Sequence, residues 1–258
     1  MVIPSQRLYF HMPVYRLLNG LDQYLSLNVN CEIYINSEFI DNHRPLDIRR
    51  IRSGFEKKGI LKRIHGPFMD LCPGSSDKKV RALSRERILE ALNLCADLGC
   101  SDMVLHSHYD PVYHKRHFDE WLNFSKMVWD DVSASAKKSN VTVYIENSED
   151  DLLEPIIAIL KEYPCFKACF DLAHYTIFGA ESWMDALRRY SKDSIGEVHL
   201  SDNDGKEDQH LVLGKGSLQV ELFLSAIDAY SDQPVITIEP HSDEDLLMDI
   251  EYMKRFKV

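Results

Sequence analysis

Six residues of types that bind divalent metals follow one another along the chain, each at the end of a short run of β-forming residues. The gaps between them are 41, 40, 25, 28 and 40 residues, each about the length of one or more strand–helix units. A single histidine or carboxylate at a strand end has many ordinary explanations. Six in series predict one shared metal site, built from His65, His106, Glu146, Asp171, His199 and Glu239.

Two of these residues are also candidates for proton transfer. Glu146 follows the run Val141–Ile145 and Glu239 follows Val235–Ile238, so we expect the two carboxylates on opposite sides of the site. One could remove a proton from a bound substrate while the other returns it. A metal ion would assist by polarising a carbonyl oxygen. Which glutamate acts as the base is left open by the sequence.

Three more candidate ligands extend the set. His174 lies one helical turn beyond Asp171 and is expected near the same ion. Asp208 and His210 alternate along a short segment of the loop after the seventh β-forming run, which would turn both side chains the same way. An acidic, solvated loop is the simpler alternative for that pair.

Substrate contacts are harder to assign from sequence. His108 is a candidate, whereas we expect His114 and His117 at the surface. Recognition of a phosphate would need a cation near the site, and Lys206 and Lys215 are the nearest candidates. The segment Gly214-Lys215-Gly216-Ser217 lacks the spacing of a P-loop, but its backbone N–H groups could line a phosphate.

The elements that must position these residues alternate between β-forming and helix-forming segments. Alternation of this kind predicts a parallel sheet. Eight repeats favour closure into one (β/α)₈ TIM barrel with eight helices, over an open doubly wound sheet. We expect a single α/β domain over residues 1–258 with strands at Leu8–Val14, Cys31–Ile35, Lys62–His65, Asp102–His106, Val141–Glu146, Lys167–Asp171, Glu197–Leu200 and Val235–Glu239.

The helical segments carry ordinary boundary signals. One apolar face runs through Arg87 to Leu98, and Gly99 is a typical residue after a helix end. A similar stripe joins Trp121 to Val132. Pro155 suits a first helical turn, and Ser242 followed by three acidic residues suits the start of the last helix.

Composition limits the classes of function. The chain has 258 residues, a formal charge of −11 and 45% hydrophobic residues. The negative charge argues against nucleic acid as a partner. No run of 18 apolar residues or basic leader is visible, so we expect neither a membrane span nor a signal peptide. The six cysteines lack paired spacing and suggest free thiols in a cytoplasmic protein.

Several stretches resemble the xylose isomerase-like TIM barrel superfamily, which includes AP endonuclease family 2. They are HGPFMDLCPGS, MVLHSHYDP, VYIENSED, CFDLAHY, EVHLSDNDGKEDQHLVLGKGS and ITIEP. The sugar isomerase and epimerase branch implies one divalent ion held by Glu146, Asp171, His199 and Glu239. The same resemblance implies that the two glutamates are the acid/base pair and that His174 contacts substrate oxygens.

The endonuclease IV branch is similar through a larger ligand set. Its three-metal site implies nine ligands, and all nine positions match in order: His65, His106, Glu146, Asp171, His174, His199, Asp208, His210 and Glu239. Three segments depart from that branch. Asn147-Ser148-Glu149-Asp150 replaces a Gly-Gln-Gly run, Leu172-Ala173 replaces Thr-Cys, and the loop from His199 to Asp208 lacks a DNA-contacting segment.

The leading interpretation is therefore a metal-dependent isomerase or epimerase of a sugar, sugar phosphate or related polyol. The alternatives are a phosphoesterase or other metallohydrolase of the endonuclease IV type, and a non-catalytic metal-binding barrel. The expected cofactor is one to three ions of Mn, Mg, Co or Zn. The expected partner is a small carbohydrate-like molecule, and the sequence does not indicate an oligomeric state.

Overall fold

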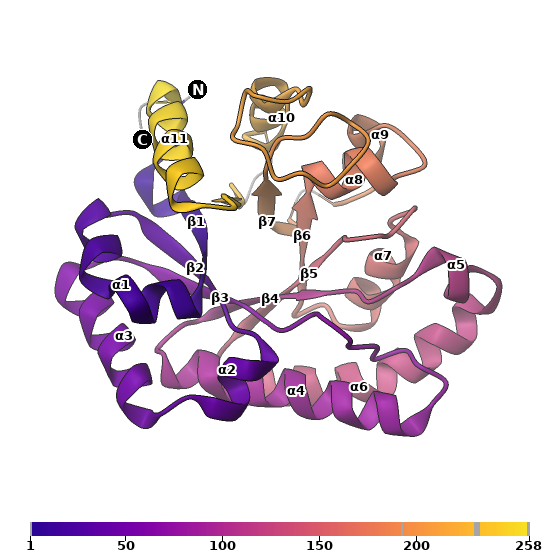
Figure 1. Cartoon of the computed structure of the whole chain (residues 1–258). Helices are drawn as coiled ribbons and strands as arrows, with labels where there is room; N and C mark the ends of the chain where they lie inside the picture. Colours follow the sequence, from indigo (N-terminus) through magenta and orange to yellow (C-terminus); the bar gives the residue numbers. More distant parts are fainter. Residues whose placement is uncertain (1, 192, 230–232, 257–258) are drawn as a thin grey trace.

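Eight parallel strands close into a barrel in the computed structural model, which describes residues 2–191, 193–229 and 233–256 (Figure 1). Each strand pairs with the next along the chain, and the last pairs with the first. This confirms the barrel, and the expected strand bounds hold to within two residues. The strands are β1 (Leu8–Pro13), β2 (Asn30–Tyr34), β3 (Lys62–His65), β4 (Asp102–His106), β5 (Thr142–Glu146), β6 (Lys167–Asp171), β7 (Ile195–Leu200) and β8 (Val235–Ile238).

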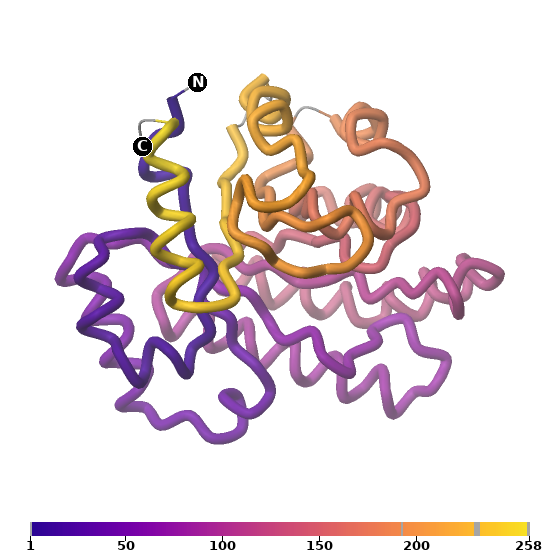
Figure 2. The backbone as a smooth tube through the Cα atoms, turned by 45° about the horizontal axis from the view of Figure 1, so that its top comes forward, coloured from indigo at the N-terminus to yellow at the C-terminus, as the bar shows by residue number. Residues whose placement is uncertain are grey.

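Helices surround the barrel, as the tube in Figure 2 also shows. The expectation of eight helices was wrong, because three of the strand-to-strand connections each contain two α-helices in the described residues. The α-helices are α1 (Val14–Leu27), α2 (Ser37–Asn42), α3 (Pro45–Lys58), α4 (Lys78–Asp97), α5 (Pro111–His114), α6 (Phe118–Ser139), α7 (Glu154–Glu162), α8 (Leu172–Phe178), α9 (Trp183–Arg188), α10 (Val220–Ile227) and α11 (Asp243–Met253). Short 3₁₀ turns are η1 (Ser5–Arg7), η2 (Lys115–His117) and η3 (Lys254–Phe256).

The predicted helix boundaries follow from local hydrogen bonding. Gly99 has a φ of +73° directly after the end of α4, a conformation that glycine adopts without strain. Pro155 lies in the first turn of α7. Ser242 caps α11, because its Oγ accepts a hydrogen bond from the backbone N–H of Asp245 at 3.0 Å. None of the helices in the described ranges is both long and apolar enough to cross a bilayer.

The barrel interior is polar below the predicted site. Side chains two residues apart on a strand face the same side. The residues two positions before His11, Tyr34 and the six predicted strand-end ligands therefore form a buried layer beneath the mouth, made of Tyr9, Glu32, Arg63, Val104, Tyr144, Cys169, Glu197 and Thr237. Arg63 is its centre: the guanidinium lies 5.1 Å from the ring centre of Tyr9 and 4.9 Å from that of Tyr144, and 3.1 Å from a carboxylate oxygen of Glu197.

The alternate strand residues belong to the main hydrophobic core between barrel and helices. Ile33, Ile64, Leu105, Ile145 and Phe170 are all fully buried there. They pack in one continuous cluster with helix residues from α6 and α10. The strands are thus held from outside by apolar packing, which leaves their inner faces free to carry polar groups.

The long loop after β7 is organised around one carboxylate. Asp202 accepts hydrogen bonds from the backbone N–H groups of Gly214 and Gly216, both at 2.9 Å, and of Leu218 at 3.0 Å. A Cβ on Gly216 would lie 2.3 Å from the Asn203 carbonyl oxygen, so only glycine fits there. The suggestion that this glycine segment lines a phosphate was wrong, because its N–H groups are already bonded. Those of Gly214 and Gly216 bind Asp202, and those of Lys215 and Ser217 donate to backbone carbonyls.

Replacing this carboxylate should loosen the loop that carries Asp208 and His210. We expect Asp202→Ala to destabilise the protein by about 1–3 kcal/mol, because it leaves buried N–H groups without an acceptor. Urea unfolding would measure the loss, and limited proteolysis would locate it in the loop. Glu207→Ala, an exposed acidic residue of the same loop, is the matched control. Equal stability of both variants would contradict the role of Asp202.

Candidate metal centre

Glu146 lies at the centre of the site, at the end of β5. One of its oxygens, Oε2, is 3.1 Å from Nε2 of His65 and 3.2 Å from Nε2 of His106. The other, Oε1, is 3.2 Å from Nδ1 of His199. These groups come from β3, β4, β5 and β7 and are buried. The parallel strands therefore deliver their C-terminal side chains to one point, as the spacing predicted.

A second group shares Glu146 and His199. The His199 Nδ1 is also 3.1 Å from Oε1 of Glu239, which follows β8. Asp171, at the end of β6, completes a set whose four donor atoms lie within 4.8 Å of one another. Its Oδ2 is buried without a hydrogen-bond partner among the described residues. Apart from an ion-pair contact of 3.7 Å with His174 Nδ1, this oxygen is free to bind a cation between these four side chains.

A third group adjoins the first two. Asp208 Oδ2 is 3.3 Å from Nε2 of His174 and 3.2 Å from Nε2 of His210. The His174 Nδ1 is 3.6 Å from Glu146 Oε1, which links this group to the centre. The structure thus brings all nine candidate ligands together, and their histidine and carboxylate donors fit up to three divalent ions.

Backbone contacts orient three of the histidines. The Nδ1 of His65 lies 2.9 Å from the Gly66 carbonyl, that of His174 lies 3.1 Å from a backbone carbonyl, and that of His210 lies 3.4 Å from another. When Nδ1 carries the proton and donates to the carbonyl, Nε2 faces the carboxylates of the site. Fixing the ring in this way is typical of histidines that bind metals.

The electrostatics favour ionised glutamates. Burial alone would raise the pKa of Glu146, but His199 and His106 lower it to well below its usual value. Burial likewise opposes ionisation of Glu239, and His199 and His11 again lower its pKa to well below the usual value. Burial raises the pKa of Asp171 to about 7. The two glutamates are therefore charged at neutral pH and able to bind a cation or accept a proton.

Sequence reasoning missed two residues of this site. His11, on β1, places Nδ1 3.2 Å from Glu239 Oε1 and stacks on His65 with ring centres 5.5 Å apart. Glu32, on β2, is fully buried with Oε1 3.2 Å from Nε2 of His199. This ion pair on the Nε2 side leaves Nδ1 of His199 facing Glu146 and Glu239.

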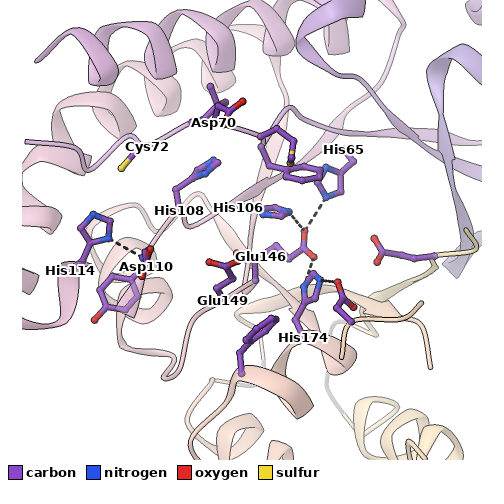
Figure 3. A pocket seen from close by; sticks show the side chains of 18 of the residues that line it. His65, Asp70, Cys72, His106, His108, Asp110, His114, Glu146, Glu149 and His174 are labelled. Carbon is purple, nitrogen blue, oxygen red and sulfur yellow. Dashed lines mark hydrogen bonds and ion pairs between the residues drawn. The ribbon is translucent and has the colours of Figure 1, made fainter. Parts of the chain in front are cut away.

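A cavity of about 670 Å³ opens above the site (Figure 3). Aromatic side chains line it, namely Phe68, Tyr109, Tyr113 and Phe178. Among the described residues its lining contains six acidic side chains but neither lysine nor arginine. Lys206 and Lys215 are exposed and do not line the cavity.

The histidines beyond β4 divide between cavity and surface. His108 lines the cavity, and burial together with His106 lowers its pKa to about 3, which keeps the ring neutral. His117 is exposed, as expected. The expectation of a surface position for His114 was wrong: its ring lines the cavity, and its Nδ1 accepts a hydrogen bond from the Asp110 N–H at 2.9 Å.

A closed parallel barrel with histidines and carboxylates gathered at the C-terminal ends of its strands defines the class of this protein, a TIM barrel with a candidate metal centre at its mouth. Within that class, the chain belongs to the xylose isomerase-like TIM barrel family, whose model matches residues 31–256. The resemblance seen in the sequence is thereby confirmed.

Similar proteins support this placement. The uncharacterized protein MJ1311 of Methanocaldococcus jannaschii is 25% identical over 203 residues, which cover 75% of this chain and 69% of the relative. A D-tagatose 3-epimerase-like protein has a TM-score of 0.81 at 20% identity, and the TTHB071 protein of Thermus thermophilus, soaked with ZnCl₂, has 0.77 at 22%. Both cover 97% of each chain. The 3-keto-D-glucoside 4-epimerase YcjR of E. coli has 0.75 at 14% identity, covering 97% of this chain and 98% of its own. At these identities the solved structures show a shared fold.

The contact between Glu32 and His199 yields a testable prediction. Glu32→Leu removes the carboxylate that pairs with His199 on its Nε2 side, so we expect affinity for Zn²⁺ or Mn²⁺ to fall about 10- to 100-fold. Glu32→Gln keeps an acceptor and should lose less. Competition with a chromogenic chelator measures the affinity, and the exposed Glu38→Gln is the control. Unaltered affinity in Glu32→Leu would show that this carboxylate does not orient the ligand.

Proposed function

We propose that this protein is a divalent-metal-dependent isomerase or epimerase of a sugar or related polyol. The observation that carries the proposal is the pair of buried glutamates, Glu146 and Glu239, whose oxygens lie 3.2 and 3.1 Å from the same nitrogen of His199. Both side chains also line the cavity. Two ionised carboxylates beside one candidate ion position and one substrate cavity suit proton removal and return.

Each residue has a distinct role in this proposal. The ion would be held by Glu146, Asp171, His199 and Glu239. It would polarise a carbonyl oxygen of the substrate and so make the neighbouring C–H group more acidic. One of the two glutamates takes that proton and the other returns one. His174 and His108, which line the cavity, contact hydroxyl groups of the substrate.

The cavity favours an uncharged sugar over a sugar phosphate. A phosphate group needs cationic side chains or ions close by, and the described lining offers acidic side chains but no lysine or arginine. Aromatic walls and neutral polar groups suit the hydroxyl-bearing faces of a sugar. Several solved structures similar to this chain are sugar epimerases by name, among them the E. coli 3-keto-D-glucoside 4-epimerase and a D-psicose 3-epimerase. A cytoplasmic location stays a prediction.

A second candidate function is hydrolysis of a phosphoester by a multinuclear site. The third ligand group, His174, Asp208 and His210, favours it, because a single-ion isomerase does not require these extra donors. Two or three ions would also supply the positive charge that the lining lacks. The net charge of −11 opposes a nucleic acid as the substrate.

Proton exchange with solvent tests the leading proposal. Each protein is saturated with the metal ion. The wild-type protein should incorporate deuterium from D₂O at the carbon next to the carbonyl of a ketose substrate, and NMR measures this incorporation. For a given ketose, exchange should slow at least about 10²-fold in the variant, Glu146→Gln or Glu239→Gln, that lacks the proton-removing carboxylate. Conversion of the ketose to product should fall in both variants, because it needs both carboxylates. Glu38→Gln should exchange like wild type. Full exchange in both variants, or conversion at the wild-type rate in either, would refute the assignment.

Metal stoichiometry separates the two candidate functions. Elemental analysis of gently purified protein should find about one ion per chain, mostly Mn, Mg or Co, with content unaffected in His210→Ala, if the four-ligand set holds the ion alone. Two or three ions, rich in Zn and reduced in His210→Ala, would favour phosphoester hydrolysis. His117→Ala, at an exposed histidine, controls for general loss of metal.

A further inference from the structure

The cavity extends well beyond the candidate metal centre. In Figure 3 His65, Glu146 and His174 lie toward one side, and Cys72 and His114 toward the other. The volume of about 670 Å³ falls within the range of roughly 300–1,000 Å³ that encloses drug-sized molecules. A second hollow of about 200 Å³ shares Cys72 and His114, together with Tyr113, with the first and continues it outward.

The loop that lines the end of the cavity farthest from the metal ligands is held in place by its own hydrogen bonds. Ser107 Oγ donates to Asp150 Oδ1 at 2.8 Å and accepts from the Tyr109 N–H at 3.1 Å. Asp110 accepts from the Val112 N–H at 2.7 Å, while its own N–H donates to His114. A loop fixed in this way loses little conformational entropy when a ligand binds.

One ring nitrogen there lacks a hydrogen-bond partner. His108 has a φ of +54°, an uncommon conformation for a residue other than glycine and one that often marks functional sites. Its ring lines the cavity, and its Nε2 is buried without a hydrogen-bond partner among the described residues. The uncommon backbone conformation marks this part of the cavity wall as a candidate binding region.

Apolar surface is also left open at this end. Tyr113 is 74% exposed and Met69 is 64% exposed, and both line the cavity. Tyr109 forms the wall between them and the buried Trp121, with ring centres 5.1 Å apart. Aromatic faces beside a few polar groups suit a pyranose ring, which presents C–H groups on its faces and hydroxyls at its edge.

We propose that this far end, lined by Cys72, His108, Tyr109, Tyr113 and His114, is a subsite for a second, uncharged sugar ring. The substrate would then be a glycoside or disaccharide whose reacting unit lies at the metal centre. This deepens the proposed function and rests on it. The acidic side chains and the lack of lysine and arginine in the described lining disfavour an anionic second ring.

Calorimetric titration of the metal-loaded protein tests the subsite. The probes are reducing and non-reducing disaccharides of glucose, galactose and fructose, each compared with its component monosaccharides. We expect at least one disaccharide to bind about tenfold or more tightly than either component, as one additional stacked ring provides. In Tyr113→Ala that ratio should fall to about twofold or less. Tyr15→Ala, an exposed tyrosine outside the cavity, should keep the wild-type ratio.

The outcomes separate the subsite from the reaction. Monosaccharides that bind as tightly as every disaccharide, or a ratio that survives Tyr113→Ala, would overturn the second-ring subsite while leaving the isomerase proposal in place. Bound sugars that exchange no proton with D₂O would instead overturn the reaction while the binding ratio still reports on the subsite. Binding of no sugar at all would overturn both.

Discussion

The buried charge of the barrel interior is the constraint on which the rest of the site depends. Five carboxylates, on Glu32, Glu146, Asp171, Glu197 and Glu239, are removed from solvent within one barrel. Burying an unpaired charge costs several kcal/mol, so each needs a cationic or hydrogen-bonding partner. In the buried layer beneath the mouth, the charge of Glu197 is balanced by Arg63, whose guanidinium lies between two tyrosine rings. At the mouth, the carboxylate charges are balanced by histidines and by any cation that these histidines help to bind.

Because the ligand groups share residues, one site fits both proton transfer on a sugar and hydrolysis of a phosphoester. Glu146 belongs to both the group with His65 and His106 and the group with Asp171 and His199. If one ion binds, the remaining histidines are free to meet substrate hydroxyls, as an epimerase needs. If three ions bind, the same side chains become ligands and the charge of the ions offsets that of the acidic lining. The number of ions therefore decides the substrate's charge as well as the reaction.

The fold could be predicted because parallel strands in a barrel end at one edge, so strand-end residues such as His65 and Glu239 must meet. The layer beneath them was not foreseen, since Glu32 in a five-residue strand looks like an ordinary exposed charge until the barrel closes around it. His11 lies inside its strand, two residues before the end, and so lacked the strand-end signal of the six ligands. The contacts of Asp202 and His114 depend on loop paths, which no periodicity encodes.

The position of Trp121 has a spectroscopic consequence. This indole is buried and contacts the rings of Tyr109 and His114, which form one wall of the cavity. A molecule that binds against those rings alters the polarity and quenching around the indole. The chain contains three tryptophans, so changes in the emission of one are a large part of the signal. The protein thus carries an intrinsic fluorophore directly behind the part of its cavity farthest from the metal ligands.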